Sequence, residues 1–399
     1  MKSIIRIFLP LTLLVSACLE KADLRLEEKS FFRIYDNADF NAAFTPIDIQ
    51  QTSDEGYLVL AGKRLDDSNF TGIYLLKVDK TGQIVNEVDD FDTQYVNPVG
   101  PLLLINGAYH FVCMDTNLQL AQLVRLNANG DIDGSITPLG LTYPLAINTD
   151  GNNILLLSYD NEDKQMDITQ LSATGSISAG PTGFSIGVGD ETEEPIINHF
   201  IQGGRKFPFA IGRTSGGAIY YNGFYNYTFS LVFTSFGADD PAGVVYGQQD
   251  DGGFSAVMPV GAGQFAASRF NFGDNFLLPQ INLTTNGITI GTELGGFTLP
   301  ELAPNATVRL LHHTTDQQAS IVFGSNTQAR QIALLAYNED DGSFTGSRYL
   351  GFANPFEIGN LIQTSDDGIA VCGITYLAGR FPRICIFKLS KQEVEELTK

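Results

Sequence analysis

Tryptophan is absent from this chain of 399 residues, and histidine and cysteine occur only four times each. A zinc site needs several converging ligands, and the only histidines close in sequence are His312 and His313. In a strand these neighbours point to opposite faces, so they do not bind one metal ion together. No H-E-x-x-H motif is present. We therefore expect no metal site and no cofactor, and no motif identifies a catalytic residue.

The N-terminal segment has the pattern of a targeting signal. Lys2 and Arg6 provide a basic start, and residues 7–15 (IFLPLTLLV) form an apolar run too short to span a bilayer comfortably. Small residues then precede Cys18 in the string VSAC. This string resembles the lipobox of bacterial lipoproteins, which implies cleavage before Cys18 and attachment of diacylglycerol to its thiol. An ordinary signal peptide with an incidental cysteine is the alternative.

These signals divide the chain into three parts. Residues 1–17 form the predicted signal peptide, residues 18–30 an acylated tether, and residues 31–399 a single domain. Acyl chains, at about 0.8 kcal/mol for each buried methylene, would hold the tether on a membrane. Leu19 rather than aspartate follows Cys18, which favours the outer membrane, and the charged tether resembles the surface-export signals of some lipoproteins. We expect a lipid-anchored outer-membrane protein on the periplasmic or surface face.

Basic residues are few, with 24 lysines and arginines against 45 aspartates and glutamates. Cleavage before Cys18 would remove Lys2 and Arg6, so the mature chain would carry 22 minus 45, or −23, formal charges. A surface this acidic repels nucleic acid and anionic lipid headgroups. We therefore expect no nucleic-acid partner and a membrane contact made through the N-terminal lipid.

Three cysteines remain after the predicted acylation of Cys18, namely Cys113, Cys372 and Cys385. An odd number excludes a fully paired disulfide framework. Cys372 and Cys385 could face each other on adjacent strands, and free buried thiols are the alternative. We assign no chemical role to any of the three.

One phrase occurs near both ends of the chain. Residues 51–62 read QTSDEGYLVLAG, and residues 363–373 read QTSDDGIAVCG. In each copy a lysine, Lys77 or Lys388, follows the last glycine of the phrase by 15 residues. A shared phrase followed by a shared interval indicates an internal repeat.

Weaker copies of the second half of this unit lie between the two. Each copy has a glycine at the same turn. Together with the glycine of the first unit, these are Gly82, Gly130, Gly175, Gly287 and Gly342. Their spacings are 48, 45, 112 and 55 residues, so the long interval contains one degenerate copy, around Ile219–Asn226. The C-terminal copy is the seventh. Each unit contains short runs of alternating apolar residues, which is typical of a propeller blade.

We predict an all-β fold, a seven-bladed β-propeller. Six or eight blades are alternatives, because residues 238–254 could be half a blade or a long loop. The run FFRIYD (31–36) is a lone strand, and the last unit ends after its third strand near Ser390. We expect residues 31–36 to complete the last blade, which would close the ring and remove two exposed sheet edges. No stretch shows a sustained helical stripe, and a linear β-solenoid is the alternative fold.

The two near-consensus copies resemble a known repeat. The strings QTSDEGYLVLAG…IYLLKVDKTG and QTSDDGIAVCG…ICIFKLSK are similar to blades of bacterial secreted and lipid-anchored β-propellers, often written QTSDGGY…AG…YLLKLDSNG. The resemblance is close in the first and last units and faint between them. It implies a propeller fold and an exterior location, and it transfers no catalytic residue.

Four acidic segments suggest further hypotheses. TSDEG (52–56) and TSDDG (364–368) resemble the core of the sialidase Asp-box, but we interpret both as hairpin turns whose carboxylate accepts backbone N–H groups. NANGDIDG (127–134) has oxygen ligands at alternate positions, as a calcium loop does, although it aligns with turns that lack them. We expect DETEE (190–194) to be a solvated acidic loop.

The densest aromatic stretch, residues 219–233, supplies the candidate binding residues. These are Tyr220, Tyr221, Phe224 and Tyr225. The first three flank a predicted turn, and exposed rings there would form a platform for a sugar or a partner protein. Core packing is the alternative.

Two functions remain open. The first is a non-enzymatic binding or scaffold lipoprotein of the cell envelope, whose loops or top face contact a protein or a glycan. The second is an envelope polysaccharide hydrolase or lyase with acidic residues around the central channel. Two carboxylates roughly 5–10 Å apart in a deep axial pocket would favour the enzyme.

Overall fold

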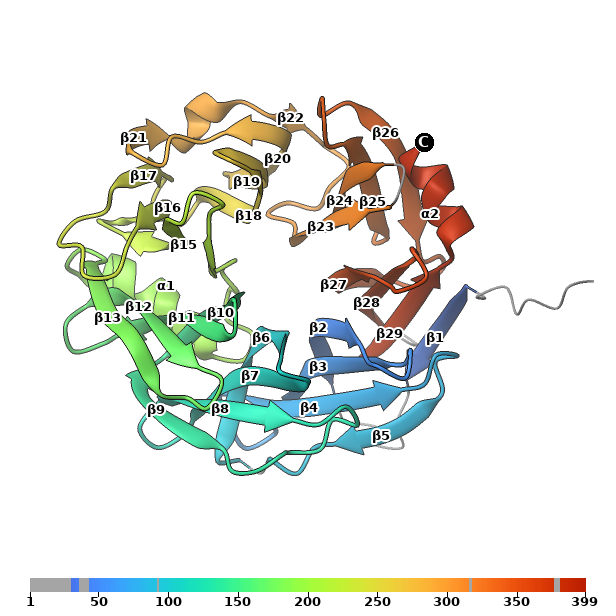
Figure 1. Cartoon of the computed structure of the whole chain (residues 1–399), viewed down its shortest axis with the longest axis horizontal. Coiled ribbons are helices and arrows are strands. Elements are labelled where there is room, and N and C mark those ends of the chain that lie inside the picture. Colours follow the sequence, from blue (N-terminus) through green and yellow to red (C-terminus); the bar gives the residue numbers. More distant parts are fainter. Residues whose placement is uncertain (1–29, 36–42, 92, 316–317, 377–380) are drawn as a thin grey trace, which may run out of the picture.

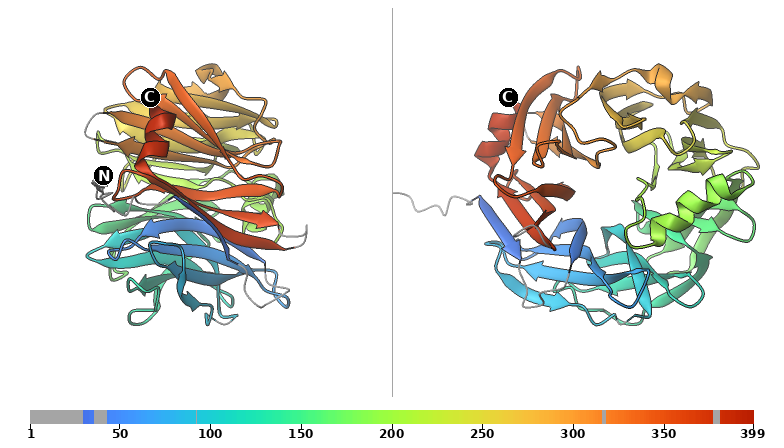
Figure 2. Two further views of the ribbon diagram at one scale, coloured as in Figure 1. Left: turned by 90° about the vertical axis from the view of Figure 1, so that its right-hand side faces the viewer. Right: turned by 180° about the vertical axis from the view of Figure 1, so that it is seen from behind.

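Seven small sheets, antiparallel except for one strand pair, surround one axis in the computed structural model, which describes residues 30–35, 43–91, 93–315, 318–376 and 381–399 (Figures 1 and 2). Each sheet is one blade, and in blades one to six the first strand in chain order lies nearest the axis (Figure 1). The prediction of a seven-bladed propeller is confirmed. Cys18 and the predicted signal peptide lie outside the described residues.

Blades one to three are built outward from the axis in chain order. Their strands are β2 (Phe44–Gln51), β3 (Tyr57–Arg64), β4 (Thr71–Val78) and β5 (Ile84–Val88); β6 (Tyr95–Ile105), β7 (Ala108–Asp115), β8 (Leu120–Leu126) and β9 (Thr137–Thr142); and β10 (Pro144–Asp150), β11 (Asn153–Asp160), β12 (Gln165–Ser172) and β13 (Ile177–Ser185).

The remaining blades follow the same plan with two variations. Their strands are β14 (Ala210–Arg213), β15 (Ile219–Tyr225), β16 (Thr228–Thr234) and β17 (Gly243–Tyr246); β18 (Gly252–Gly261), β19 (Gln264–Asn271), β20 (Asp274–Asn282) and β22 (Phe297–Thr298); β23 (Val308–Thr314), β24 (Ala319–Asn326), β25 (Ile332–Asn338) and β26 (Phe344–Leu350); and β27 (Phe356–Gln363), β28 (Ile369–Tyr376), β29 (Pro382–Leu389) and β1 (Phe31–Tyr35).

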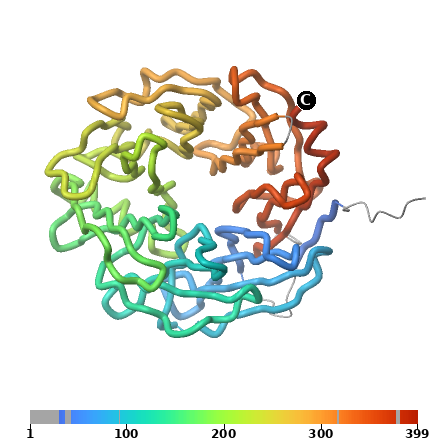
Figure 3. Tube along the Cα trace, in the orientation of Figure 1, coloured from blue at the N-terminus to red at the C-terminus, as the bar shows by residue number. Residues whose placement is uncertain are grey.

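The ring is closed by β1, which is the outer strand of blade seven. It pairs antiparallel with β29, from Phe31 opposite Lys388 to Tyr35 opposite Ile384, as the sequence predicts. The Phe32 ring stacks on that of Phe387, with centroids 4.4 Å apart. Because the two chain ends share one sheet, the trace returns to its starting point and leaves no gap between first and last blades (Figure 3).

The repeated turn glycine packs against the preceding blade. Gly82 has φ +78°, which favours glycine, and a Cβ there would lie 2.8 Å from the Phe31 ring. Gly130 in blade two has φ +83° and approaches Leu58 of blade one in the same way. Gly287 is the exception, since a Cβ there would meet nothing within 4 Å. At Gly287 the positive φ of +106°, and not close contact with a neighbouring side chain, favours glycine.

Blades four and five depart from the regular plan at that point. After β20 the chain crosses to blade four, where β21 (Gly287–Ile290) pairs in parallel with β17. A short 3₁₀ helix, Gly291–Leu294, leads to β22, which has only two residues. Residues 238–254 contain β17 and the start of β18, so they are neither half a blade nor a plain loop, and the count is seven.

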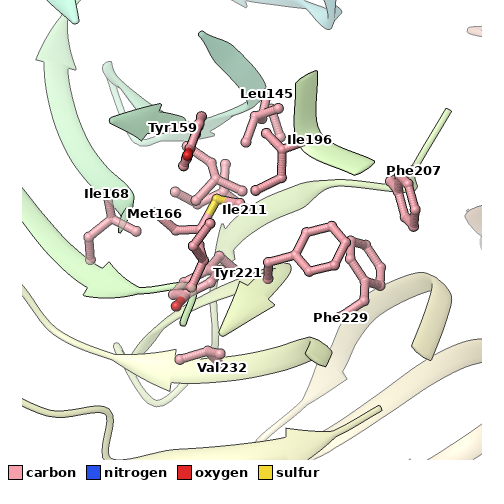
Figure 4. Packing of buried hydrophobic residues seen from close by; sticks show 14 of the residues in the cluster. Leu145, Tyr159, Met166, Ile168, Ile196, Phe207, Ile211, Tyr221, Phe229 and Val232 are labelled. Atoms are coloured by element: carbon pink, nitrogen blue, oxygen red, sulfur yellow. The ribbon is translucent and has the colours of Figure 1, made fainter. Parts of the chain in front are cut away.

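Apolar side chains fill the seven junctions between neighbouring blades. Each junction holds its own buried cluster, and the largest lies between blades three and four (Figure 4). There Tyr159 and Met166 of blade three pack with Tyr221 and Phe229 of blade four. A blade of about fifty residues buries an apolar face only against its neighbours, so the closed ring is preferred over isolated units. The linear solenoid is excluded.

Two helices correct the prediction that the chain lacks helical stripes. The expected acidic loop 190–194 is the first turn of α1 (Asp190–Phe200), where Thr192, Ile196 and Phe200 form a buried stripe. α2 (Lys391–Thr398) begins with a capping box between Ser390 and Glu393 and packs on β26. Among the described residues, no helix is long and apolar enough to cross a membrane.

All three described cysteines are free and buried. Cys372 lies opposite Ile386, and Cys385 opposite Gly373, in the pairing of β28 with β29. This offset of one residue turns the two thiols to opposite faces of the blade, so the open question of a disulfide is settled in favour of free thiols. Burial raises the pKa of the Cys113, Cys372 and Cys385 thiols.

We expect the native chain carrying Cys18→Ser to be inert towards an aromatic disulfide reagent. The three thiols are protonated and shielded, and only the thiolate attacks. In denaturant three equivalents should react, which absorbance of the released thiolate measures. Rapid reaction of one or more equivalents with the native chain would contradict the burial described above.

Candidate functional site

A cavity of about 480 Å³ opens at the axis, among the innermost strands of blades three to seven. We call it the axial cavity. Its volume lies within the range of roughly 300–1,000 Å³ that is usual for small-molecule sites. Its wall combines apolar, amide and guanidinium side chains, among them Asn148, Phe209, Arg213, Met258, Arg309 and Asn360.

Two arginines line the axial cavity in different electrostatic states. Arg213 donates from Nε to Asp150 Oδ1 at 2.8 Å and from Nη2 to Asp150 Oδ2 at 2.6 Å. This bidentate pair lowers the pKa of the Asp150 carboxyl and neutralises the guanidinium. Arg309 donates from Nε to the Gly359 carbonyl at 2.6 Å, and no carboxylate among the described residues forms an ion pair with it.

Polar side chains near the axis link neighbouring blades. Asn360 of β27 donates from Nδ2 to Asp48 of β2, whose other oxygen accepts the Leu102 N–H of β6 at 2.6 Å. Asp48 is fully buried, and this burial raises the pKa of its carboxyl despite those hydrogen bonds. Asn148 similarly donates to the Ile211 carbonyl at 2.9 Å. These amides fix the blades relative to one another and orient the wall of the cavity.

The acidic pair that a hydrolase would need does not line the axial cavity. Among the described residues, none of those that line it is an aspartate or glutamate. Asp150 is committed to Arg213, and Asp48 is buried behind Asn360. The string GFSIG (183–187) matches a hydrolase nucleophile pattern that the sequence argument did not use, but it lies at the end of the outer strand β13. The geometry therefore counts against hydrolysis at the axis.

The two TSD-G turns are structural, as we interpreted them. Asp54 accepts hydrogen bonds from the Thr52 hydroxyl, the Gly56 N–H at 3.1 Å and Lys77 Nζ at 2.8 Å. Burial opposes ionisation of Asp54, but these hydrogen bonds outweigh it and lower its pKa to about 2. The interval of 15 residues in the repeat thus places a lysine on the turn aspartate, a role that the sequence argument missed.

The same lysine–aspartate arrangement recurs in blade seven, where the carboxylate is less exposed to solvent. Lys388 Nζ lies 2.6 Å from Asp366 Oδ2, and its side chain is 6% exposed against 7% for the carboxylate. In blade one the Lys77 side chain is fully buried, but Asp54 is 56% exposed. The pKa of the Asp366 carboxyl is also lowered, because the Lys388 and Thr364 hydrogen bonds outweigh its burial. Both lysines tie the inner turn of a blade to its third strand.

The aromatic platform predicted in blade four is wrong for three of its four residues. Tyr220, Tyr221 and Phe224 are 4%, 0% and 1% exposed, because β15 is a second strand covered on both faces. The turn lies at residues 226–227, four residues later than expected, so the rings belong to the core. Tyr225 is half-buried and stacks on Tyr246 with centroids 6.3 Å apart. Only Tyr220 reaches the wall of the axial cavity.

Neither the calcium loop nor the histidines form a metal-binding cluster in the described part of the chain. Asn127 Oδ1 accepts the N–H groups of Asn129 and Asp131, so this segment is a capped hairpin turn. His312 contacts Glu339 at 2.8 Å, while its neighbour His313 is buried and contacts the Asp367 carbonyl. The opposed faces expected of these two histidines are confirmed.

One buried carboxyl lies outside the axial cavity. Asp167 on β12 is 5% exposed, and its Oδ1 has no hydrogen-bond partner among the described residues. Burial first, and then the charges of Asp160 and Asp163, raise its pKa to about 7. Since the folded-state pKa is above the unfolded value near 3.9, stability is lost as the pH rises from about 4 through 7.

Asp167→Asn should therefore stabilise the chain at pH 8 and have little effect at pH 4. We expect the free energy of unfolding to rise by roughly 2 kcal/mol at pH 8, because the amide removes the buried charge. Urea denaturation at both pH values measures this. Asp239→Asn, at an exposed site whose charge does not act on Asp167, is the control and should change neither value. Equal effects of Asp167→Asn at both pH values would contradict the assigned titration.

The fold and cavity define the class: a seven-bladed β-propeller that is closed by its N-terminal strand and hollow at its axis. The chain matches no model of a protein family, and no curated protein matches it in sequence. Among solved structures it is similar to the β-propeller domain of the Trilobed protease from Pyrococcus furiosus, with a TM-score of 0.50, 8% identity, and coverage of 89% of this chain and 97% of that one.

A quinonprotein alcohol dehydrogenase-like protein from Bacteroides thetaiotaomicron is also similar, with a TM-score of 0.43 and 10% identity. That alignment covers 77% of this chain and 66% of the other. The structure of a protein titled a putative 6-phosphogluconolactonase, from Bacteroides uniformis, has a TM-score of 0.41 and 13% identity. That alignment covers 86% of this chain and 92% of the other. At these identities the likeness concerns the propeller fold alone.

Proposed function

We propose that this protein is a non-enzymatic binding propeller of the bacterial cell envelope, anchored to the outer membrane through a lipid on Cys18. The observation that carries the proposal is the axial cavity: it has the size of a ligand site, and its described lining contains arginine and amide side chains without a carboxylate. Such a wall can hold a ligand but offers no acid–base pair for glycoside cleavage. The partner is a glycan or a protein of the envelope.

The lipid anchor is tested by metabolic labelling with an alkyne fatty acid in a bacterial host. We expect the wild-type chain to incorporate the label and to sediment with outer membranes. Cys18→Ser should lose the label and leave that fraction. Label retained by Cys18→Ser would contradict acylation at this cysteine.

The binding role is tested by cross-linking the anchored chain in cells and recovering it from outer-membrane extracts. We expect one envelope protein or glycan to be enriched relative to an unrelated lipid-anchored protein. Recovery of no specific partner would contradict the scaffold role. Release of reducing ends from envelope polysaccharides by the purified chain would instead support the hydrolase alternative.

A further inference from the structure

We infer that the axial cavity binds a sugar acid, a monocarboxylate with neighbouring hydroxyl groups such as a uronic acid, with Arg309 as its anion contact. This inference deepens the proposed function and rests on it, because it names the part of a glycan that the cavity would hold. It is argued from the guanidinium, the amide and the apolar wall described above.

Arg309 is a cation without an ion-pair partner among the described residues, although the charge of the buried Asp48 carboxyl acts on it and favours its protonated form. Its Nε donates to the Gly359 carbonyl at 2.6 Å, which fixes the guanidinium, and its two terminal nitrogens have no hydrogen-bond partner among the described residues. The side chain is half-buried on β23 and lines the axial cavity. A planar fork with unused donors matches the two oxygens of a carboxylate.

The number of matched charges points to a monoanion. Arg213, the second guanidinium in the wall, is neutralised by Asp150 and also donates from Nη1 to the Gly217 carbonyl at 2.7 Å. Among the described residues that line the cavity, one guanidinium without an ion-pair partner therefore remains, in a chain whose formal net charge is −21. Long-range repulsion from the net negative charge of the chain weakens the binding of dianions such as phosphate more than the binding of a monocarboxylate.

The rest of the wall suits a hydroxylated ring. Asn360 donates from Nδ2 to Asp48, and its Oδ1 has no donor among the described residues, so it can accept a ligand hydroxyl. Phe209, Met258 and Leu310 supply apolar surface for the carbon face of a ring. A guanidinium donor, an amide acceptor and an apolar wall within one cavity of about 480 Å³ have the chemistry of a sugar acid.

Titration calorimetry on the full chain carrying Cys18→Ser tests this inference, with glucuronate as the ligand and glucose and inorganic phosphate as comparisons. We expect glucuronate to bind at least about tenfold more tightly than either comparison. Arg309→Gln and Arg309→Lys should each weaken glucuronate binding by about tenfold or more, because neither side chain offers the charged fork. Arg125→Gln removes the same charge from a side chain that is 52% exposed in blade two, away from the axial cavity, and should change nothing.

A second variant separates loss of binding from loss of folding. Thr149 is exposed and lines the cavity, so Thr149→Phe should obstruct it and abolish binding while the melting temperature stays unchanged. Equal affinity for glucose and glucuronate, equal affinity for phosphate, or full binding by Arg309→Gln would each overturn the inference. Absence of glucuronate binding with an envelope partner still recovered would overturn it and leave the proposed function standing.

Discussion

A chain that begins at residue 37, without β1, should lose about 5 kcal/mol or more of its free energy of unfolding and should self-associate. The truncation removes the strand that pairs with β29 over five residues. It also removes Tyr35, which is buried, and Phe31 and Ile34, which pack against neighbouring clusters. Each apolar side chain of this size contributes roughly 1.5–3 kcal/mol when buried. Such a loss is a large fraction of the 5–15 kcal/mol that is usual for a whole domain.

The association follows from the exposed edge. Without β1, the backbone N–H and C=O groups on the outer side of β29 are open to a strand of another molecule. Denaturant unfolding and size-exclusion chromatography measure the two effects. A chain that begins at residue 30 retains β1 and is the matched control, which should remain monodisperse. An unchanged unfolding midpoint for the shorter chain would contradict closure by β1.

Lys388→Met should cost about 3–5 kcal/mol of unfolding free energy at pH 7. The substitution keeps most of the side-chain volume but leaves the Asp366 carboxylate buried without its cation, since that side chain is only 7% exposed. Breaking a buried ion pair by removing one partner is costly because the remaining charge is not solvated. Urea denaturation monitored by circular dichroism provides the measurement.

The matched control is Lys77→Met in blade one. Its turn and its position in the repeat are the same, and Lys77 also donates to the turn aspartate, but Asp54 is 56% exposed and can be solvated after the lysine is removed. We expect this variant to lose less than half as much stability as Lys388→Met. If the two variants cost the same, burial of the carboxylate is not what sets the energy.

Most of the architecture could be predicted from the repeat, because the residues that define the repeat are required by local backbone conformation and packing. The turn at Gly82 has a positive φ and lies in close contact with the preceding blade, so it favours glycine, and this glycine can be recognised in the sequence. The lone run at Phe31–Tyr35 had no partner within its own unit, which predicted closure with β29. Fold class, blade count and closure could therefore be predicted from one chain.

The exchange between blades four and five could not be predicted in this way. The turn at Gly287 resembles the other units in sequence, but β21 pairs with β17 of the preceding blade. Strand pairing across a long crossover depends on tertiary contacts that no local pattern records. The stripe of Thr192, Ile196 and Phe200 was present in the sequence, but it is short and contains one polar residue.

The candidate site was missed for a related reason. Tyr220, Tyr221 and Phe224 are aromatic and lie beside a glycine, which suggested a turn, but the same composition suits a strand packed on both faces. The wall of the axial cavity is assembled from residues of five blades, most of them on the innermost strands. Arg309 and Asn360 are about fifty residues apart and belong to no motif, so only the closed ring brings them together.

The most direct test of the closed ring uses the thiol already present in β29. Ile34 lies opposite Cys385 in the pairing of β1 with β29, and both side chains belong to the cluster between blades six and seven. Residues directly opposite in an antiparallel pair have Cβ atoms about 4.5–5.5 Å apart, close enough for a disulfide after small adjustment. Ile34→Cys should therefore form a disulfide with Cys385 under mild oxidation of the folded chain, detected by mass spectrometry of peptides under non-reducing conditions. Arg33→Cys, on the other face of β1, should form none, and absence of the Ile34→Cys link to Cys385 would contradict the closure.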